Sequence, residues 1–276
     1  MSPLSTDCLS IFLSPLELVT VLWRGLPQRI VAKRIDPIAP RGAAANADAT
    51  AATSAALLGI LREFASPRTR LTLSSHYTRY LLLPWRADLN DSDEEHAAAR
   101  LAFVETFGAA AAGWRIRLGD ETPGHTHLAA AVDDQLITAI EQAAQTANTR
   151  LLSVQPYLVS AANRWRHRIA GHAATWLVLH EEQRACLALI EAGEWRWVRS
   201  MRLPAGWIAS LPELIEHEDL LAGRETAAAE VLLFAPGEAE LAANGGGGQS
   251  FRRLQLEPRS GFSPLTDAHF GCALVA

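Results

Sequence analysis

The sequence predicts a mixed α/β protein of two related lobes, and two stretches carry this prediction. Residues 174–204 alternate apolar and polar side chains in three runs, separated by charged residues at 180–184 and by Ala192-Gly193-Glu194. This alternation is typical of a three-stranded antiparallel meander. Residues 8–36 repeat the order, with turns at Ser14-Pro15-Leu16 and Gly25-Leu26-Pro27. Because both copies end the second strand on a glycine-containing turn and carry arginine on the third, we infer an internal duplication.

The stretch between the first meander and residue 107 predicts a helix, two β runs and a second helix. Residues 54–65 have helical spacing, whereas 43–53 fit either the start of that helix or a mobile linker. Two β-rich runs at 69–85 fit either a hairpin or one long bent strand. The acidic run at 91–95 favours a helix start, where carboxylates face the positive end of the helix dipole. No second carboxylate cluster completes a metal cage there.

The following region alternates strands and helices. We expect strands at 113–119 and 125–133, a helix at 133–147, a strand at 149–156 and a helix at 157–169. The order strand, helix, strand, helix resembles a crossover unit, which would place parallel strands beside the antiparallel meander.

The second meander is followed by a similar but shorter series. The pattern predicts a helix at 205–222, a strand at 227–235, a short helix at 238–242, a strand at 250–258 and a buried terminal run at 267–276. Four glycines at 245–248 precede a strand, whereas anion-binding glycine loops open onto a helix. We therefore interpret them as a flexible hairpin tip.

The composition excludes several classes of function. The chain has 276 residues, a formal charge of −5 and a pI near 6.0, which give no reason to expect nucleic-acid binding. The basic cluster at 164–168 is interpreted as a solvated helix end. Lys33 is the only lysine and lies between Ala32 and Arg34 in a predicted strand. This position argues against both a P-loop and Schiff-base catalysis.

The cysteines and the apolar runs predict the compartment. Cys8, Cys186 and Cys272 each lie in an apolar run without a CxxC pattern, so we expect buried, unpaired thiols in a reducing cytoplasm. No signal-peptide pattern is found, and no run approaches the roughly 18 to 20 apolar residues that span a bilayer. We expect a soluble cytoplasmic protein without direct membrane insertion.

Motifs that resemble catalytic or metal sites are incomplete. His180-Glu181-Glu182 lacks the second histidine of the HExxH zinc motif, and His125 and His127 lack a third ligand. Ser74-Ser75-His76 lacks the glycine-flanked turn of a serine hydrolase. We therefore assign no catalytic residue, no cofactor-binding residue and no metal ligand, and we expect no cofactor.

The tryptophans are candidates for core or partner contacts. Trp195 and Trp197 alternate with charged residues on one strand, so we expect both rings on one face, packed in the core or exposed to a partner. Trp85, Trp165 and Trp207 lie at element ends, where large rings are expected to cover lobe junctions.

The order of elements resembles the actin-like ATPase superfamily, a two-lobed fold with duplicated ribonuclease H-like cores. Within it the chain resembles the type IV pilus assembly protein PilM and the cytoplasmic domain of the type II secretion protein GspL. The resemblance rests on residues 131–165, similar to the passage that ends the first lobe, on 177–204, similar to the second-lobe opening, and on the closing run 269–276. It implies lobes at residues 1–170 and 171–276.

The resemblance also implies where a nucleotide would bind. Actin-like ATPases hold phosphates in the turns between the first two strands of each meander, where glycine lets the backbone approach and aspartate holds hydrated magnesium. Here the turns are residues 13–17 and 180–184, which contain neither glycine nor aspartate. A third turn, Ala235-Pro236-Gly237-Glu238, has one glycine where the family has two. We expect no bound nucleotide.

The resemblance therefore implies a non-catalytic cytoplasmic scaffold of a type IV pilus or type II secretion-like inner-membrane complex, with a membrane-anchored partner. It implies a partner peptide in a groove of the first lobe, for which the sequence indicates no residues. One alternative is an actin-like ATPase or sugar-kinase relative with a divergent ATP site. Another is an oligomerising structural protein, since actin-like lobes often form filaments.

Overall fold

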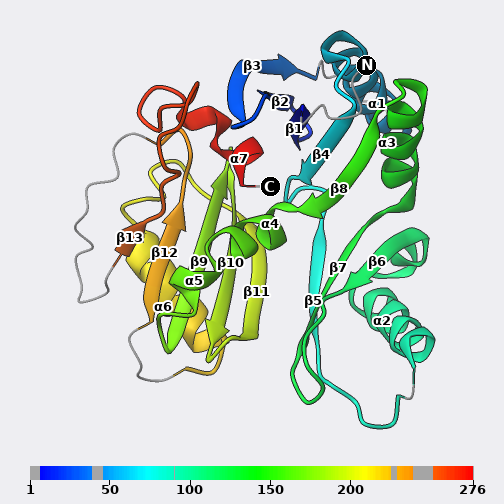
Figure 1. Cartoon of the computed structure of the whole chain (residues 1–276). Coiled ribbons are helices and arrows are strands. Elements are labelled where there is room, and N and C mark those ends of the chain that lie inside the picture. Colours follow the sequence, from blue (N-terminus) through cyan, green and yellow to red (C-terminus); the bar gives the residue numbers. More distant parts are fainter. Residues whose placement is uncertain (1–6, 39–45, 90, 225–228, 239–250, 276) are drawn as a thin grey trace.

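Two five-stranded sheets, joined by helices, form the body of the molecule in the computed structural model (Figure 1). It describes residues 7–38, 46–89, 91–224, 229–238 and 251–275. The strand order is β3-β2-β1-β4-β8 in one sheet and β11-β10-β9-β12-β13 in the other. In both, an antiparallel meander is followed by two parallel strands. The predicted mixed α/β fold class with a duplicated core is confirmed.

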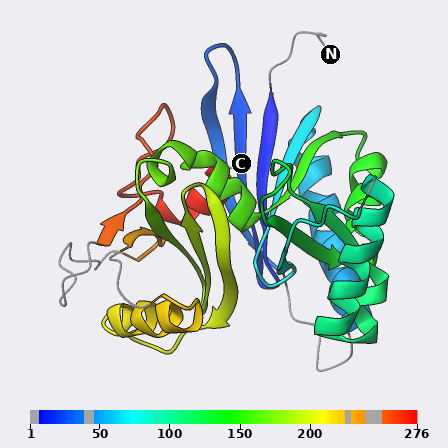
Figure 2. The same cartoon turned by 90° about the horizontal axis from the view of Figure 1, so that it is seen from below.

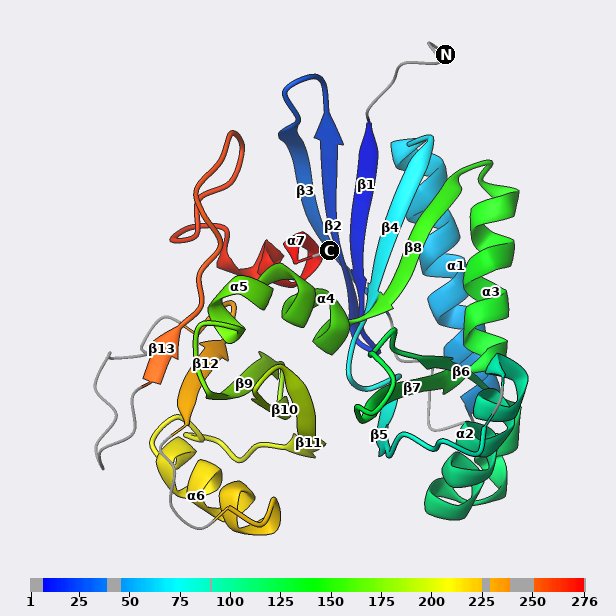
Figure 3. The same cartoon turned by 60° about the horizontal axis from the view of Figure 1, so that its bottom comes forward.

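The first sheet separates two hydrophobic cores. Its strands are β1 (Cys8–Leu13), β2 (Glu17–Arg24), β3 (Arg29–Pro37), β4 (Arg68–Leu73) and β8 (Arg150–Pro156). Because strand side chains alternate between faces, Leu9 and Ile11 face one core and Phe12 faces the other. Helices α1 (Asn46–Phe64) and α3 (Asp134–Thr146) cover the first face with Leu61 and Ile140 (Figure 3).

The second sheet repeats this arrangement. Its strands are β9 (Ala174–Glu181), β10 (Arg184–Glu191), β11 (Glu194–Arg202), β12 (Glu230–Phe234) and β13 (Phe251–Arg253). Trp176 and Val178 face helix α6 (Leu211–Leu221), whereas Leu177 and Leu179 face the other core. Figure 2 shows α6, in yellow, on the outer flank of its sheet, and α1 and α3 on the outer flank of the first sheet.

A third, smaller sheet extends the first lobe. It has the order β5-β7-β6, from β5 (Arg79–Leu83), β6 (Trp114–Leu118) and β7 (His127–Asp133). Helix α2 (Ser92–Phe107) and the 3₁₀ turn η1 (Ala109–Gly113) pack on it through Phe103 and Ala111. The Asp91 carboxylate accepts hydrogen bonds from the backbone of Asp93 and Glu94, both at 2.9 Å. The acidic run therefore starts a helix, as predicted.

Several predicted elements differ from those observed. The two runs at 69–85 are not a hairpin, because β4 and β5 belong to different sheets. Parallel strands lie beside the meander as predicted, but they are β4 and β8; β7 (125–133 in the prediction) pairs antiparallel with β5 and β6 in the small sheet. The predicted helix 157–169 is two helices, α4 (Tyr157–Arg164) and α5 (Arg166–Ile169), because Trp165 has φ −108° and ψ 18°, outside the helical range.

Other predictions are confirmed with changed bounds or fall outside the described residues. From residue 46 onward the alanine-rich stretch is helical, and the predicted helix 205–222 begins only at Leu211. The short helix at 238–242, beyond its first residue, and the glycines at 245–248 lie outside the described residues.

One hydrophobic core lies between the two large sheets and contacts both. Helices α4 and α5 and the terminal helix α7 (Gly271–Leu274) occupy this space in Figure 3. The core joins Phe12 of the first sheet and Leu179 of the second through Tyr157, Phe234 and Leu274. The hydrophobic core between the sheets therefore contains residues of both lobes.

The C-terminal segment returns from the second sheet to the first. The Ile30 backbone N–H donates to the Ser260 carbonyl at 3.0 Å, and Lys33 Nζ lies 2.5 Å from Asp267 Oδ2. The Arg259 guanidinium lies over the Trp23 ring, 5.4 Å from its centre. Beyond the 3₁₀ turn η2 (Ala268–Phe270), α7 contacts β1, β2 and β4. The segment thus ties the lobes together.

Candidate functional site

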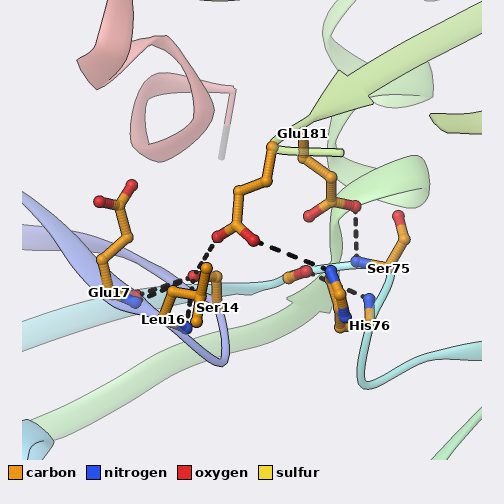
Figure 4. A network of polar contacts seen from close by, with 8 residues as sticks. Ser14, Leu16, Glu17, Ser75, His76 and Glu181 are labelled. Atoms are coloured by element: carbon orange, nitrogen blue, oxygen red, sulfur yellow. Dashed lines mark hydrogen bonds and ion pairs between the residues drawn. The ribbon is translucent and has the colours of Figure 1, made fainter. Parts of the chain in front are cut away.

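The two turns predicted to hold phosphates in a nucleotide-binding relative meet directly. The Ser14 hydroxyl, in the turn between β1 and β2, donates to Glu182 Oε1 at 2.9 Å, in the turn between β9 and β10 (Figure 4). A third turn, at residues 74–76 after β4, contacts the carboxylates of Glu181 and Glu182. We call this meeting point of residues 13–17, 74–76 and 180–184 the junction.

The backbone donors of the first turn are already used within it. The N–H groups of Leu16 and Glu17 both donate to Ser14 Oγ, at 3.2 and 3.1 Å (Figure 4). Pro15 has no N–H to offer. Phosphates in turns of this kind are bound by free backbone N–H groups. The Ser14 hydroxyl therefore takes the donors that a phosphate would need.

Carboxylates fill the space between the turns. Glu181, only 7 % exposed, accepts a hydrogen bond from the Ser75 N–H through Oε1 at 2.8 Å. Its Oε2 has no hydrogen-bond partner among the described residues. Burial raises the pKa of Glu181, partly offset by the nearby Ser74 and Ser75 hydroxyls. Burial and the neighbouring Glu182 raise the pKa of Glu17. The junction thus concentrates desolvated negative charge.

His76 lies at the edge of the junction and remains neutral at physiological pH. Its Nε2 is 3.9 Å from Glu182 Oε2. Burial, and then the charges of Arg184, Arg202 and Arg79, lower the pKa of His76 to about 4. No serine hydroxyl donates to its ring within the described ranges, so Ser74-Ser75-His76 does not form a nucleophile and base pair.

The third predicted turn is covered by the C-terminal segment. Gly237 has φ +93°, and a Cβ built there would lie 2.8 Å from Cε1 of the His269 ring. The hollow beside this turn, lined by Pro236 and Leu254 among others, measures about 40 Å³. That is room for roughly one or two waters, so an adenosine does not fit without movement of His269 and its neighbours.

A larger groove lies in the first lobe. It has a volume of about 590 Å³ and runs between α3, α4, the end of β8 and the small sheet. Its apolar lining comes from Leu73, Leu118, Leu128, Ala130, Val132, Ile137, Val154, Pro156, Val159, Ala162 and Trp195. Charged side chains also line it, namely Arg115, Arg117, Asp120, Glu121 and Glu141. An apolar lining with a few charged groups is typical of a peptide or ligand groove.

Trp195 and Trp197 lie on opposite faces of β11, so the prediction of a shared face is wrong. The register with β10 shifts between Leu189 and Ile190, which pair with Trp197 and Trp195. This bulge places one extra residue, Arg196, between the rings and reverses the alternation. Trp195 lines the groove. Trp197 packs under α6, where its Nε1 donates to Glu218 Oε2 at 2.8 Å.

The remaining candidate residues have structural partners. His180 stacks on Trp207 with ring centres 4.6 Å apart, and Trp165 packs on Phe234 in the core between the sheets at the same centre distance. Trp85 is 41 % exposed instead and covers no lobe junction.

His125 and His127 bind carboxylates rather than each other. His125 Nε2 lies 3.1 Å from Glu194 Oε1 and His127 Nδ1 lies 3.6 Å from Glu121 Oε2. Across the described parts of the chain, no group of three potential ligands is placed to hold a metal.

The cysteines are buried, as predicted. Burial raises the pKa of the Cys186 thiol to about 12, which leaves it protonated and unreactive at neutral pH. Burial also raises the pKa of Cys8 and Cys272. The sequence analysis singled out the turns at 13–17 and 180–184, but it could not show that these turns meet or that residues 74–76 join them, because the contacts link distant segments.

Comparisons with solved structures identify the fold. A chain of the PilM–PilN type IV pilus biogenesis complex superposes with a TM-score of 0.66 at 14 % identity, covering 97 % of both chains. The cytoplasmic domain of EpsL, an inner membrane component of the type II secretion system of Vibrio cholerae, gives 0.59 at 13 % identity, covering 98 % of this chain and 96 % of that one.

A third match has no assigned function. A Bacteroides thetaiotaomicron protein with an actin-like ATPase fold gives a TM-score of 0.58 at 10 % identity, covering 85 % of this chain and 84 % of that one. No family model matches the sequence, and no curated protein does. The chain therefore has the actin-like fold, and the resemblance predicted from residues 131–165, 177–204 and 269–276 is confirmed.

Proposed function

We propose that this protein is a non-catalytic actin-like scaffold that binds a membrane-anchored partner in a pilus or type II secretion-like assembly. Structures of similar fold come from a type IV pilus complex and from a component of a type II secretion system. The observation that carries the proposal is the direct hydrogen bond from Ser14 to Glu182, at 2.9 Å, between the two turns.

Charge at the junction opposes a triphosphate. Glu17, Glu181 and Glu182 lie where the turns meet, and burial already raises the pKa of two of them. Bringing the negative phosphates among these carboxylates costs free energy in a poorly solvated site, unless a cation or a proton compensates. The donors of the first turn would also have to release Ser14 Oγ.

The groove of the first lobe is proposed as the partner site. Its apolar lining suits an extended peptide with apolar side chains, and the basic residues Arg115 and Arg117 and the acidic residues Glu121 and Glu141 suit charged flanks. No helix within the described ranges is long and apolar enough to cross a membrane. In the proposed assembly the partner supplies the membrane anchor, and the scaffold lies at the cytoplasmic face of the inner membrane.

The lobes are proposed to divide between residues 170 and 171. This point lies in the turn that links α5 to β9. The segment from 259 onward would then act as a strap from the second lobe onto the first, because it contacts β1 to β3.

The experiment is peptide binding in solution. A fluorescein-labelled peptide with the cytoplasmic N-terminal sequence of an inner-membrane pilus or secretion protein of the same organism is titrated with the protein, and anisotropy is followed. We expect saturable binding that Ala162→Arg, which fills the groove from α4, weakens at least ten-fold. Leu220→Arg, on the far face of α6, is the matched control. Binding that is absent, or indifferent to Ala162→Arg, would contradict the groove assignment.

One observation favours the alternative, an ATPase or sugar-kinase relative with a divergent ATP site. Arg184 and Arg202 are cross-strand neighbours in β10 and β11, and Arg79 lies close enough to share the electrostatic field around His76. None of the three forms an ion pair with a carboxylate among the residues described. These arginines could bind phosphates outside the two turns.

Thermal unfolding separates the two functions. A ligand at about 100 times its dissociation constant adds about 2.7 kcal/mol to the free energy of unfolding. We expect Mg-ATP to leave the melting temperature unchanged. A concentration-dependent rise that Arg184→Ala removes would favour the ATPase alternative. Light scattering over a concentration series tests the oligomerising alternative, which requires growth beyond a dimer.

A further inference from the structure

A second hollow lies at the far end of the small sheet, away from the junction. It has a volume of about 240 Å³ and lies between α2, the ends of β5 and β6, and the loop after β5. Its apolar lining comes from Leu83, Pro84, Trp85, Leu89, Ala98, Leu101, Ala102 and Leu118. We call it the α2 pocket.

Helix α2 has two apolar faces, and only one packs against the small sheet. Ala99 and Phe103 are fully buried against the small sheet. Ala98, Leu101 and Ala102 lie at helical spacing on a neighbouring face and line the pocket. Leu101 is 59 % exposed. A leucine and a tryptophan exposed beside a concave apolar surface are typical of a protein-binding site.

The charged residues around the pocket are mostly acidic. Glu95 and Glu105 line it from α2, and neither forms an ion pair within the described residues. Arg86, the one arginine of the lining, is already paired with Asp88 at 2.5 Å. The first turn of α2 adds the exposed acids Asp93 and Glu94. The rim therefore attracts a cation.

The size of the pocket limits what enters it. Drug-sized ligands occupy cavities of about 300 to 1,000 Å³, so 240 Å³ suits a single large side chain. A few buried anchors, often aromatic and ringed by contacts that exclude water, supply most of the affinity of protein interfaces.

We propose that the α2 pocket binds one aromatic or leucine side chain of a partner segment that carries arginine or lysine next to that anchor. The α2 pocket adjoins the peptide groove, because Leu118 lines both, but the proposal does not depend on the function proposed for the groove. It gives the first lobe a second docking surface.

The test uses three tripeptides that differ in one feature each. Saturation-transfer NMR compares acetyl-Arg-Trp-Arg-amide with acetyl-Glu-Trp-Glu-amide and with acetyl-Arg-Ala-Arg-amide on the full chain. We expect binding of the first peptide alone. Because an exposed ion pair is worth about 0.2–1 kcal/mol, removing two of them with Glu95→Gln and Glu105→Gln should weaken binding by roughly two- to thirty-fold.

Two further variants separate pocket binding from general effects. Leu101→Asp, which places a charge in the pocket, should abolish binding, whereas Leu220→Asp, at a site 70 % exposed on α6, should leave it unchanged. Equal binding of the acidic peptide, or binding that persists in Leu101→Asp, would overturn the proposal. So would a dimer in light scattering that Leu101→Asp dissociates, because the occupant would then be a second copy.

Discussion

At the scale of single residues, the Ser14–Glu182 hydrogen bond links the two turns. Ser14 is 1 % exposed, accepts from two backbone N–H groups and donates to the Glu182 carboxylate. Glu182 has φ +52°, a strained conformation for a residue with a side chain. The sequence showed that the turns lack glycine and aspartate, but not that they touch, because the contact joins residues 168 positions apart.

The first prediction concerns this hydrogen bond. Ser14→Ala should lower the free energy of unfolding by about 1.5–3 kcal/mol, the range for hydrogen bonds to charged groups. In a double-mutant cycle with Glu182→Gln, measured by urea unfolding, a coupling energy of about 1 kcal/mol is expected. Additive effects of the two substitutions would show that the bond does not contribute to stability.

The second prediction concerns His76 and acid. Its pKa is about 4 in the folded state and 6.5 in the unfolded state, so between these values the unfolded chain binds the extra proton. Stability from this group is therefore present above pH 6.5 and lost as the pH falls toward 4, by at most about 3 kcal/mol. His76→Gln should flatten this limb in urea unfolding at several pH values. A dependence of stability on pH that His76→Gln leaves unchanged would show that the pKa of His76 is not lowered in the folded protein.

At the scale of elements, regular patterns were predicted well and departures from regularity were not. The meander strands are short runs of residues typical of β-strands, bounded by turn residues, so they could be placed to within about two residues. The bulge at Arg196 has no such signal, because Trp-Arg-Trp alternates normally along the chain. The break at Trp165 and the assignment of β5 to another sheet also depend on contacts between distant segments.

The third prediction concerns the turn between β10 and β11. Ala192 has φ +50° and Gly193 has φ +85°, and the left-handed region is unfavourable for alanine. Ala192→Gly should raise the free energy of unfolding by about 0.5–1 kcal/mol in urea unfolding. Gly193→Ala should lower it by a similar amount. If Ala192→Gly lowered stability and Gly193→Ala raised it, the turn would not need these left-handed conformations.

At the scale of the molecule, the core between the sheets makes the two lobes one unit. Strands β1 and β9, helix α4 and the C-terminal helix contribute to it, and the C-terminal segment adds polar contacts to β3. Composition and pattern predicted two related lobes but could not show that their inner faces share a core. The residues of the groove were likewise not predictable, since strands β4, β6, β7, β8 and β11 and helices α3 and α4 all contribute to it.

The fourth prediction tests this shared core. Leu274 is 2 % exposed, and Leu274→Ala should cost about 2–5 kcal/mol through lost burial and the cavity that remains. Tryptophan fluorescence and circular dichroism should still report a single coincident transition, because the lobes unfold together. Leu220→Ala, at an exposed site, should change stability by less than about 0.5 kcal/mol. Two separate transitions would contradict a shared core.

We propose that carboxylates and a serine hydroxyl occupy the places where an actin-like ATPase would hold a triphosphate. Isothermal titration calorimetry of the wild-type protein with Mg-ATP measures this most directly. We expect no saturable heat up to millimolar nucleotide. A saturable heat with a stoichiometry near one would show that the junction admits a triphosphate.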